Sequence, residues 1–291
     1  KSLTGDVWAV VGWHSLFMAC TILISARGVG KGLEMTVKYL MPMLFILLLA
    51  LVLWAALTSG HFLEGMTFLF SIKSEDFSGD AVLVAMGQAF FTLSLGMGAI
   101  MAYGAYLPKS ASIVGSATTI ALLDTVVALL SGMVIFPIVF ANGLESSAGP
   151  GLMFITLPIA FGQMSGGQLF GTVFFLLVTF AAITSAISLV EPAIAWLVEK
   201  LKVSRAAAAV SIGVLAWFWG LGTAFSFNIW DDVMILPEKT FFDTMDYVSN
   251  NIILPLGGVL IATFTGWFLN RAIFDEELGD LSGWLKTVLM L

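Results

Sequence analysis

Asp124 places a carboxylate inside an apolar run, where a charged side chain needs a neutralising partner or a functional role. It lies in Ile-Ala-Leu-Leu-Asp-Thr-Val-Val-Ala-Leu-Leu, and no lysine or arginine lies within a helical turn of it. Ionisable groups at membrane depth are costly and are functional candidates by default. A proton, a distant cation or a bound metal ion could neutralise the charge, and sodium would suit a carboxylate joined by other hard oxygen ligands. A protonated, hydrogen-bonded Asp124 is the structural alternative.

A second polar group follows in residues 181–192, Ala-Ala-Ile-Thr-Ser-Ala-Ile-Ser-Leu-Val-Glu-Pro. Thr184, Ser188 and Glu191 share one helical face, because they are spaced at i, i+4 and i+7. Hydroxyls in membrane helices often bond only their own backbone. The adjacent Thr184 and Ser185, with a glutamate and a proline downstream, form a richer pattern than that alternative usually gives.

Residues 87–98 read Gly-Gln-Ala-Phe-Phe-Thr-Leu-Ser-Leu-Gly-Met-Gly and lie within an apolar run from about 81 to 107. A glycine within a helix costs about 1 kcal/mol relative to alanine. Irregular backbone at membrane depth is tolerated only where protein or a wet cavity surrounds it, and a glycine-broken span is a pointer to a transporter's substrate site. The alternative is an intact helix whose glycines let a neighbour pack closely.

The composition requires elements that cross a membrane. The 291 residues are 59% hydrophobic and 11% charged, with a mean hydropathy of +1.01, whereas soluble domains are about 25% charged. The apolar runs are too long for barrel strands. We therefore expect an all-α polytopic membrane protein, with spans at about 8–26, 33–58, 81–107, 114–141, 168–198, 204–226 and 241–270, and an eighth that would begin near 282.

The connections between these spans alternate in charge. By the positive-inside rule, the basic ones face the cytoplasm, and they contain Arg27, Lys31, Lys109, Lys200, Lys202, Arg205 and Arg271. The acidic connections face outward. One of them, 142–167, is apolar enough that we expect it to fold back into the protein as a re-entrant plug or lid. Pro42 in the second span predicts a kink, which is either static or a hinge.

Four motifs in this order resemble the neurotransmitter:sodium symporter family, in its bacterial branch. They are Phe90-Phe-Thr-Leu-Ser-Leu-Gly-Met-Gly, Ala181-Ala-Ile-Thr-Ser, Gly32 with Pro42 ten residues later, and Phe154-Ile-Thr-Leu-Pro. The resemblance covers essentially the whole chain. It implies a partial leucine-transporter-type inverted-repeat fold with a broken helix near 93–98, running from the family's fourth helix to the start of its eleventh.

The resemblance also implies ligands for two sodium ions and a substrate. Thr92 and Asp124 would bind the first sodium, and the second would be bound by Ala181, Thr184 and Ser185. The residues that would line the substrate pocket are Phe91, Ser94, Met97 and Leu189. Gly96 and Gly98 flank Met97 as in relatives that accept bulky hydrophobic and aromatic amino acids.

Moving parts are implied in the same way. Asp246 would be the acidic half of the outer gate and Glu199 that of the inner gate, with Gln88 and Tyr106 at gate-associated positions. Gly32, Pro42, Gly96 and Gly98 would be hinges. The family's first three helices have no counterpart here, so the chain would hold about half of each site and is not expected to transport alone.

The function that follows is sodium-coupled import of neutral hydrophobic, including aromatic, amino acids by alternating access in the inner (plasma) membrane. The alternative is a transporter-fold sensor or channel-like protein without coupled uptake, although a channel would need a ring of like groups around one axis. We expect no enzyme, since His14 and His61 have no catalytic partners at a recognisable spacing. Twelve basic residues without a patch argue against nucleic-acid binding, and Cys20 is expected to be a packed thiol.

Overall fold

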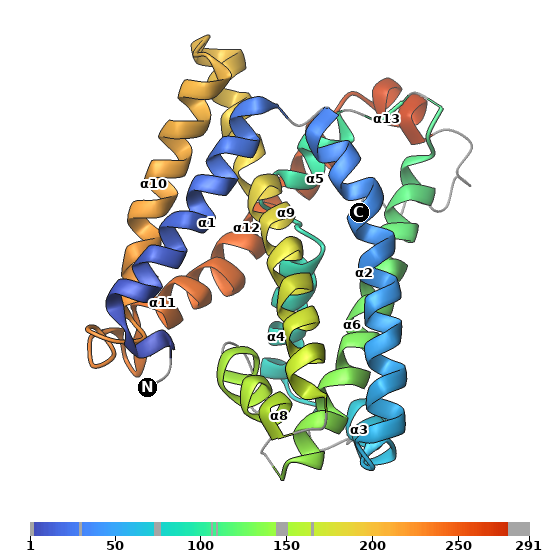
Figure 1. The fold of residues 1–291 in the computed structure, drawn as a ribbon. Helices are drawn as coiled ribbons and strands as arrows, with labels where there is room; N and C mark the ends of the chain where they lie inside the picture. The colour runs from blue at the N-terminus through green and yellow to red at the C-terminus, as the bar shows by residue number, and fades with distance from the viewer. Residues whose placement is uncertain are drawn as a thin grey trace.

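The structure is a computed structural model that describes residues 3–28, 31–72, 77–105, 107–108, 110–143, 151–163 and 166–278 (Figure 1). The helices are η1 (Leu3–Gly5), α1 (Val7–Arg27), α2 (Lys31–Thr58), α3 (Phe62–Phe70), α4 (Gly79–Thr92), α5 (Ala99–Gly104), α6 (Ile113–Ala141), η3 (Leu152–Thr156), α8 (Leu157–Gln163), α9 (Gly167–Leu201), α10 (Arg205–Phe225), α11 (Phe241–Val248), η4 (Ser249–Ile253), α12 (Leu254–Thr263), η5 (Phe264–Phe268) and α13 (Arg271–Leu278). The strands are β1 (Met234–Leu236) and β2 (Lys239–Thr240), which pair antiparallel.

The long helix α9 lies between two groups of helices (Figure 1). On one side α1 and α10 pack along each other and against α9. On the other side α2, α6 and α8 pack against α9 and one another, and α3 packs on α6. The residues of the 181–192 face therefore sit on the helix that both groups share.

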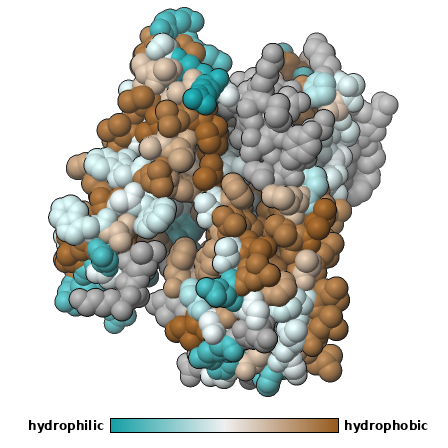
Figure 2. Space-filling view, viewed as in Figure 1, coloured by the Kyte–Doolittle hydropathy of each residue, from teal (hydrophilic) through white to brown (hydrophobic). Residues whose placement is uncertain are grey.

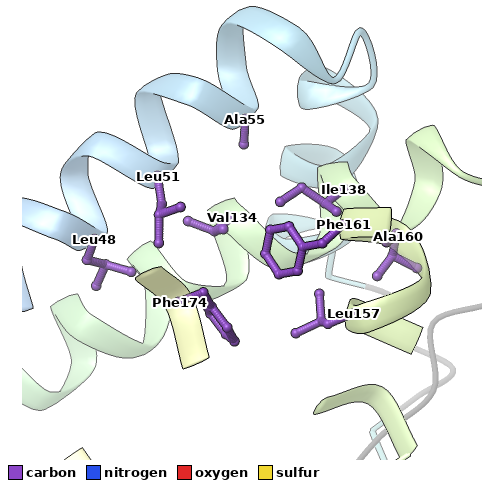
Figure 3. Packing of buried hydrophobic residues seen from close by; sticks show 10 residues of the cluster. Leu48, Leu51, Ala55, Val134, Ile138, Leu157, Ala160, Phe161 and Phe174 are labelled. Carbon is purple, nitrogen blue, oxygen red and sulfur yellow. The ribbon is translucent and has the colours of Figure 1, made fainter. Parts of the chain in front are cut away.

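The larger core joins α2, α6, α8 and α9. It is built from buried aliphatic and aromatic side chains, among them Leu51, Ile138, Leu157 and Phe161 (Figure 3). Leu157 and Phe161 come from the apolar part of the 142–167 connection, which packs back onto the helices. Between membrane-spanning helices such side chains stabilise mainly through van der Waals packing, because lipid tails are as apolar as they are.

Side-chain caps explain where several helices begin. Asp6 accepts hydrogen bonds from the backbone N–H groups at the start of α1, and Ser78, Ser112 and Ser204 do the same for α4, α6 and α10. The first N–H groups of a helix have no partner within it, so a hydroxyl or carboxylate at the cap stabilises the start.

Five helices in the described part of the chain are long and apolar enough to cross a membrane: Val7–Arg27, Ile113–Ala141, Gly167–Leu201, Arg205–Phe225 and Phe241–Phe268. A bent pair, Pro42–Thr58 with Phe62–Phe70, would give a sixth if it is one span. Large apolar side chains such as Leu53 and Leu260 are exposed, and Figure 2 shows hydrophobic residues over much of one face. These features confirm an all-α polytopic membrane fold.

The structure adds details that periodicity did not predict. Helices α2 and α3 meet at 119°, where a plain outer connection was expected. The run 241–268 is helical but includes two π-helical segments, η4 and η5. Helix α2 stays helical through Pro42, so the chain is not unwound there in this structure, and the hinge role of Gly32 and Pro42 stays a prediction.

Basic and acidic connections fall at opposite ends of the molecule (Figure 1). The turn between α9 and α10, α5 and α13 lie at one end, whereas α3, α8 and the β1–β2 hairpin lie at the other. This arrangement agrees with the sidedness that the positive-inside rule gives. The expected span near 282 lies outside the described residues.

Candidate functional site

The broken helix is present where the family resemblance implied it, so the alternative of an intact helix with glycines at a packing contact is wrong. Helix α4 ends at Thr92 and α5 begins at Ala99. Between them Ser94, Gly96 and Gly98 have φ angles of 55°, 78° and 81°. Glycine adopts this left-handed region freely, but a serine there costs about 1–3 kcal/mol. The surrounding packing must offset that cost, and the interruption frees backbone groups for other partners.

The break is packed backbone to backbone against α12. A Cβ atom at Gly96 would overlap the carbonyl oxygen of Leu254, and one at Gly257 would overlap the carbonyl oxygen of Gly96. A Cβ atom at Gly258 would overlap the ring of Phe90. Sequence analysis missed this contact, although the Gly257-Gly258 pair within an apolar helix was a signal for close packing.

Thr92 and Asp124 come together across α4 and α6. The Thr92 hydroxyl donates a hydrogen bond of 2.9 Å to Oδ1 of Asp124. In the part of the chain that the structure describes, Asp124 forms no ion pair with a lysine or arginine. The pair therefore joins a hydroxyl oxygen to a carboxylate that lacks a cationic neighbour, next to the break, and this is a suitable beginning for a sodium site.

The predicted residues for the second sodium lie on one turn of α9. The Thr184 hydroxyl donates to the Ala181 carbonyl oxygen at 2.8 Å, and the Ser188 hydroxyl donates to the Thr184 carbonyl oxygen at 2.9 Å. Ser185 is exposed. In this structure Thr184 and Ser188 thus follow the alternative in which hydroxyls bond their own helix. The same geometry holds the Thr184 hydroxyl beside the Ala181 carbonyl, the two groups predicted to be ligands.

The four predicted substrate residues come from two elements. Phe91, Ser94 and Met97 belong to the end of α4 and the break, and Leu189 belongs to α9. Phe91 and Leu189 are about half exposed, at 53% and 49%. Large apolar side chains thus stay open beside the break in the described chain.

Two predicted gate residues share one cavity of about 510 Å³. Gln88 and Asp246 line it, and Asp246 accepts a hydrogen bond of 2.8 Å from Asn250. Lys239, which sequence analysis did not single out, also lines the cavity, with its Nζ atom 5.1 Å from the ring centre of Tyr247. The cavity is completed by Val84, Gly87, Glu238, Asp243 and Asn251.

The other predicted gate positions are not part of that cavity. Glu199 is exposed near the C-terminal end of α9, which Figure 1 places at the opposite end of the molecule from the hairpin. Tyr106 lies outside the described residues. The roles of all four gate positions stay predictions.

A buried ion pair holds α1, α9 and α10 together. Glu191 is 1% exposed, and both of its carboxylate oxygens accept hydrogen bonds from Arg205, at 3.0 and 2.6 Å. Arg205 also donates through Nε to the carbonyl oxygen of Ser25, in the last turn of α1. Glu191 therefore does not offer its charge to the hydroxyl face of α9. Sequence analysis placed Arg205 only as a basic residue of a cytoplasmic connection.

Comparison with known proteins decides the family. The model of the family described as "Sodium:neurotransmitter symporter family" matches residues 6–262. The chain belongs to this family. Its members are symporters, so the chain is classed with transport proteins and not with enzymes, and its relatives and apolar helices place it in the inner membrane as a multi-pass protein.

Individual members of the sodium:neurotransmitter symporter family are similar over most of the chain. An uncharacterized sodium-dependent transporter of Bacillus subtilis (strain 168), YhdH, is 40% identical over 263 residues, covering 90% of this chain and 58% of that protein. One from Haemophilus influenzae is 34% identical over 94% of this chain and 59% of its own length. The chain thus spans somewhat more than half the length of these relatives.

A solved structure agrees in fold. The crystal structure of MhsT in complex with L-phenylalanine matches with a TM-score of 0.91 and 40% identity, over 99% of this chain and 66% of that one. Together with the helices and the break, this match confirms the leucine-transporter-type fold that the motifs implied.

Proposed function

We propose that this chain is the larger part of a sodium-coupled symporter that imports neutral hydrophobic amino acids, aromatic ones included, by alternating access. The observation that carries the proposal is the Thr92–Asp124 hydrogen bond beside the broken helix. It joins a hydroxyl, at the place where the backbone is interrupted, to a carboxylate that has no cationic partner among the described residues.

In this proposal Thr92 and Asp124 supply oxygen ligands to one sodium ion. Ala181, Thr184 and Ser185 supply them to a second ion, for which the Thr184 hydroxyl would have to turn its hydrogen away from the Ala181 carbonyl. Sodium takes several oxygen ligands, as the hard alkaline-earth cations do, so other carbonyl oxygens have to complete both sites.

The break itself would bind the substrate's charged ends. A half-helix that starts at Ala99 directs N–H groups toward the break, and this end of a helix favours a carboxylate. Gly96 and Gly98 let the backbone turn here without a side chain in the way.

The proposed substrate is apolar because of what would surround its side chain. Phe91, Met97 and Leu189 have no polar group that could satisfy a charged side chain, and burying one unpaired is expensive. Support also comes from the similar protein MhsT, whose crystal structure is a complex with L-phenylalanine.

Sodium supplies the driving force in this scheme. Each ion that moves inward down the membrane potential contributes about 2.3 kcal/mol per 100 mV. Two ions can therefore support accumulation on the order of 10³-fold from the potential alone. We further propose that three helices preceding the region in this chain complete both sodium sites and the substrate site, so that the 291 residues alone do not transport.

Uptake into liposomes tests this proposal on the full-length protein, including the three expected helices. Labelled leucine and tryptophan are offered with sodium outside and, in parallel, with potassium outside. We expect sodium-dependent accumulation of both, and none of labelled lysine or aspartate.

Each departure from that result removes a different part of the proposal. Uptake of leucine alone would remove the aromatic substrates and keep the symporter. Equal uptake in sodium and potassium would contradict sodium coupling, and would favour the sensor or channel-like alternative.

A further inference from the structure

A hydrogen bond ties the inner half of the broken helix to α9. The hydroxyl of Tyr103, on α5, lies 2.7 Å from the hydroxyl of Ser188, and both residues are partly buried. The Ser188 hydroxyl has a single hydrogen, and it points to the carbonyl oxygen of Thr184. Both bonds can form together only when Tyr103 is the donor to Ser188.

The bond adjoins two hydrogen bonds within α9. Ser188 donates to the backbone carbonyl of Thr184, and the side-chain hydroxyl of Thr184 donates separately to the Ala181 carbonyl. The two bonds that share the Ser188 hydroxyl polarise each other and orient it. They end on the backbone of Thr184, one of the residues proposed to hold the second sodium.

Helix α5 depends on such contacts for its position. It has only six residues, too few for a helix to be stable in isolation, and it follows Gly98 in a left-handed conformation. Its start lies against α9, because a Cβ atom added at Gly98 would lie 3.5 Å from the ring of Pro192, an ordinary contact distance. Tyr103 adds a polar attachment one turn further along.

We propose that Tyr103 is a positioning residue that couples the inner half of the broken helix to the second sodium site through Ser188. The inference rests on the proposed function and names a residue that the sequence motifs do not. Tyr103 fixes the Ser188 hydroxyl toward the Thr184 carbonyl, and this holds the backbone of the 181–188 turn. The Ala181 carbonyl and the Thr184 hydroxyl oxygen then keep their places when the Thr184 hydrogen turns away from Ala181 to admit the ion. Movement of α5 away from α9 breaks the Tyr103–Ser188 bond and loosens the turn that carries these ligands.

The test is a double-mutant cycle on the full-length protein with Tyr103→Phe and Ser188→Ala. Binding of labelled L-phenylalanine is titrated with sodium chloride, and phenylalanine affinity is measured at saturating sodium. Each single variant should raise the half-saturating sodium concentration about threefold, the size typical of one interhelical hydrogen bond in a membrane. The double variant should also show about threefold rather than ninefold, with phenylalanine affinity at saturating sodium unchanged.

Two further variants distinguish coupling from general damage. Ser188→Thr keeps the hydroxyl and should bind sodium as the unmodified protein does. Thr179→Val removes a hydroxyl that donates to the Phe175 carbonyl of the same helix, and it should leave sodium dependence unchanged.

Three outcomes would overturn the coupling role of Tyr103 while leaving sodium-coupled transport in place. They are additive effects of the two substitutions, no change in the half-saturating sodium concentration, and an equal loss of phenylalanine affinity at saturating sodium. An unmodified protein that binds phenylalanine without any sodium dependence would overturn both the coupling and the proposed function.

Discussion

At the scale of single residues, Asp124 decides the chemistry. The partly buried carboxylate of Asp124 accepts a hydrogen bond from the Thr92 hydroxyl, and one neutral hydrogen bond is a small compensation for a charge at membrane depth. A cation at the same oxygens would compensate far more. In the proposed function, sodium binding at Asp124 would also offset this charge.

Asp124→Asn should keep the size of the side chain and an oxygen that can accept from Thr92, but remove the charge. Interactions with a charged group are worth about 1.5–3 kcal/mol, so the sodium concentration for half-maximal substrate binding should rise at least tenfold. A sodium titration of substrate binding measures this rise. Asp231→Asn, in an exposed turn, is the control. Identical titrations for the Asp124 and Asp231 variants would show that the first sodium is bound elsewhere.

At the scale of elements, the break is held by α12 as much as by its own glycines. Gly96 and Gly98 both have positive φ, but only Gly96 would bring a Cβ atom into overlap with backbone, because Gly98 has Pro192 at an ordinary contact distance. The two positions therefore differ in how much room the neighbouring helix leaves.

This difference predicts an order of stability. Gly98→Ala should cost about 1–2 kcal/mol for its left-handed backbone. Gly96→Ala should cost clearly more, because the carbonyl of Leu254 cannot move aside as a flexible side chain could. Gly12→Ala, in α1 with nothing within 4 Å, is the matched control and should be tolerated. Thermal unfolding midpoints in detergent measure the order, and equal midpoints for the Gly96 and Gly98 variants would contradict the packing of the break on α12.

The Glu191–Arg205 pair makes a second prediction for the elements. Arg205→Met leaves the buried carboxylate unpaired and should destabilise the α1–α9–α10 group by about 3–5 kcal/mol. Glu191→Met with Arg205→Met removes both charges and should be less destabilised than Arg205→Met alone. Chemical or thermal unfolding of the three proteins tests this, and a double variant as unstable as Arg205→Met would mean that the charge is not the cause.

These elements also mark what the sequence could predict. The long helices were predictable because apolar runs act locally, whereas the glycine run left an intact helix possible and only the family resemblance implied the break at 93–98. The Thr92–Asp124 contact followed from a family resemblance. The approach of Gly257 to Gly96 and the pairing of Glu191 with Arg205 could not be predicted, since they depend on how separate helices meet, which no local pattern encodes. Tyr103 was missed for the same reason.

At the scale of the whole molecule, the residues of the proposed sites lie on separate elements with different packing partners, since α4 packs on α12 and α6 packs on α2. Thr92 and Asp124 lie on α4 and α6, whereas Thr184 lies on α9, which both groups of helices contact. A site divided in this way can open and close when these helices move relative to each other, as alternating access requires. The proposed substrate and both ions would then bind where α4, α6 and α9 meet.

The most direct test of sodium coupling is accumulation against a gradient. Liposomes containing the full-length protein are loaded with labelled and unlabelled L-phenylalanine at equal concentrations inside and outside, and an inward sodium gradient is then imposed. We predict net inward movement that stops when an ionophore equalises sodium and the potential. Phenylalanine that stays at its equal distribution while the sodium gradient persists would contradict the account.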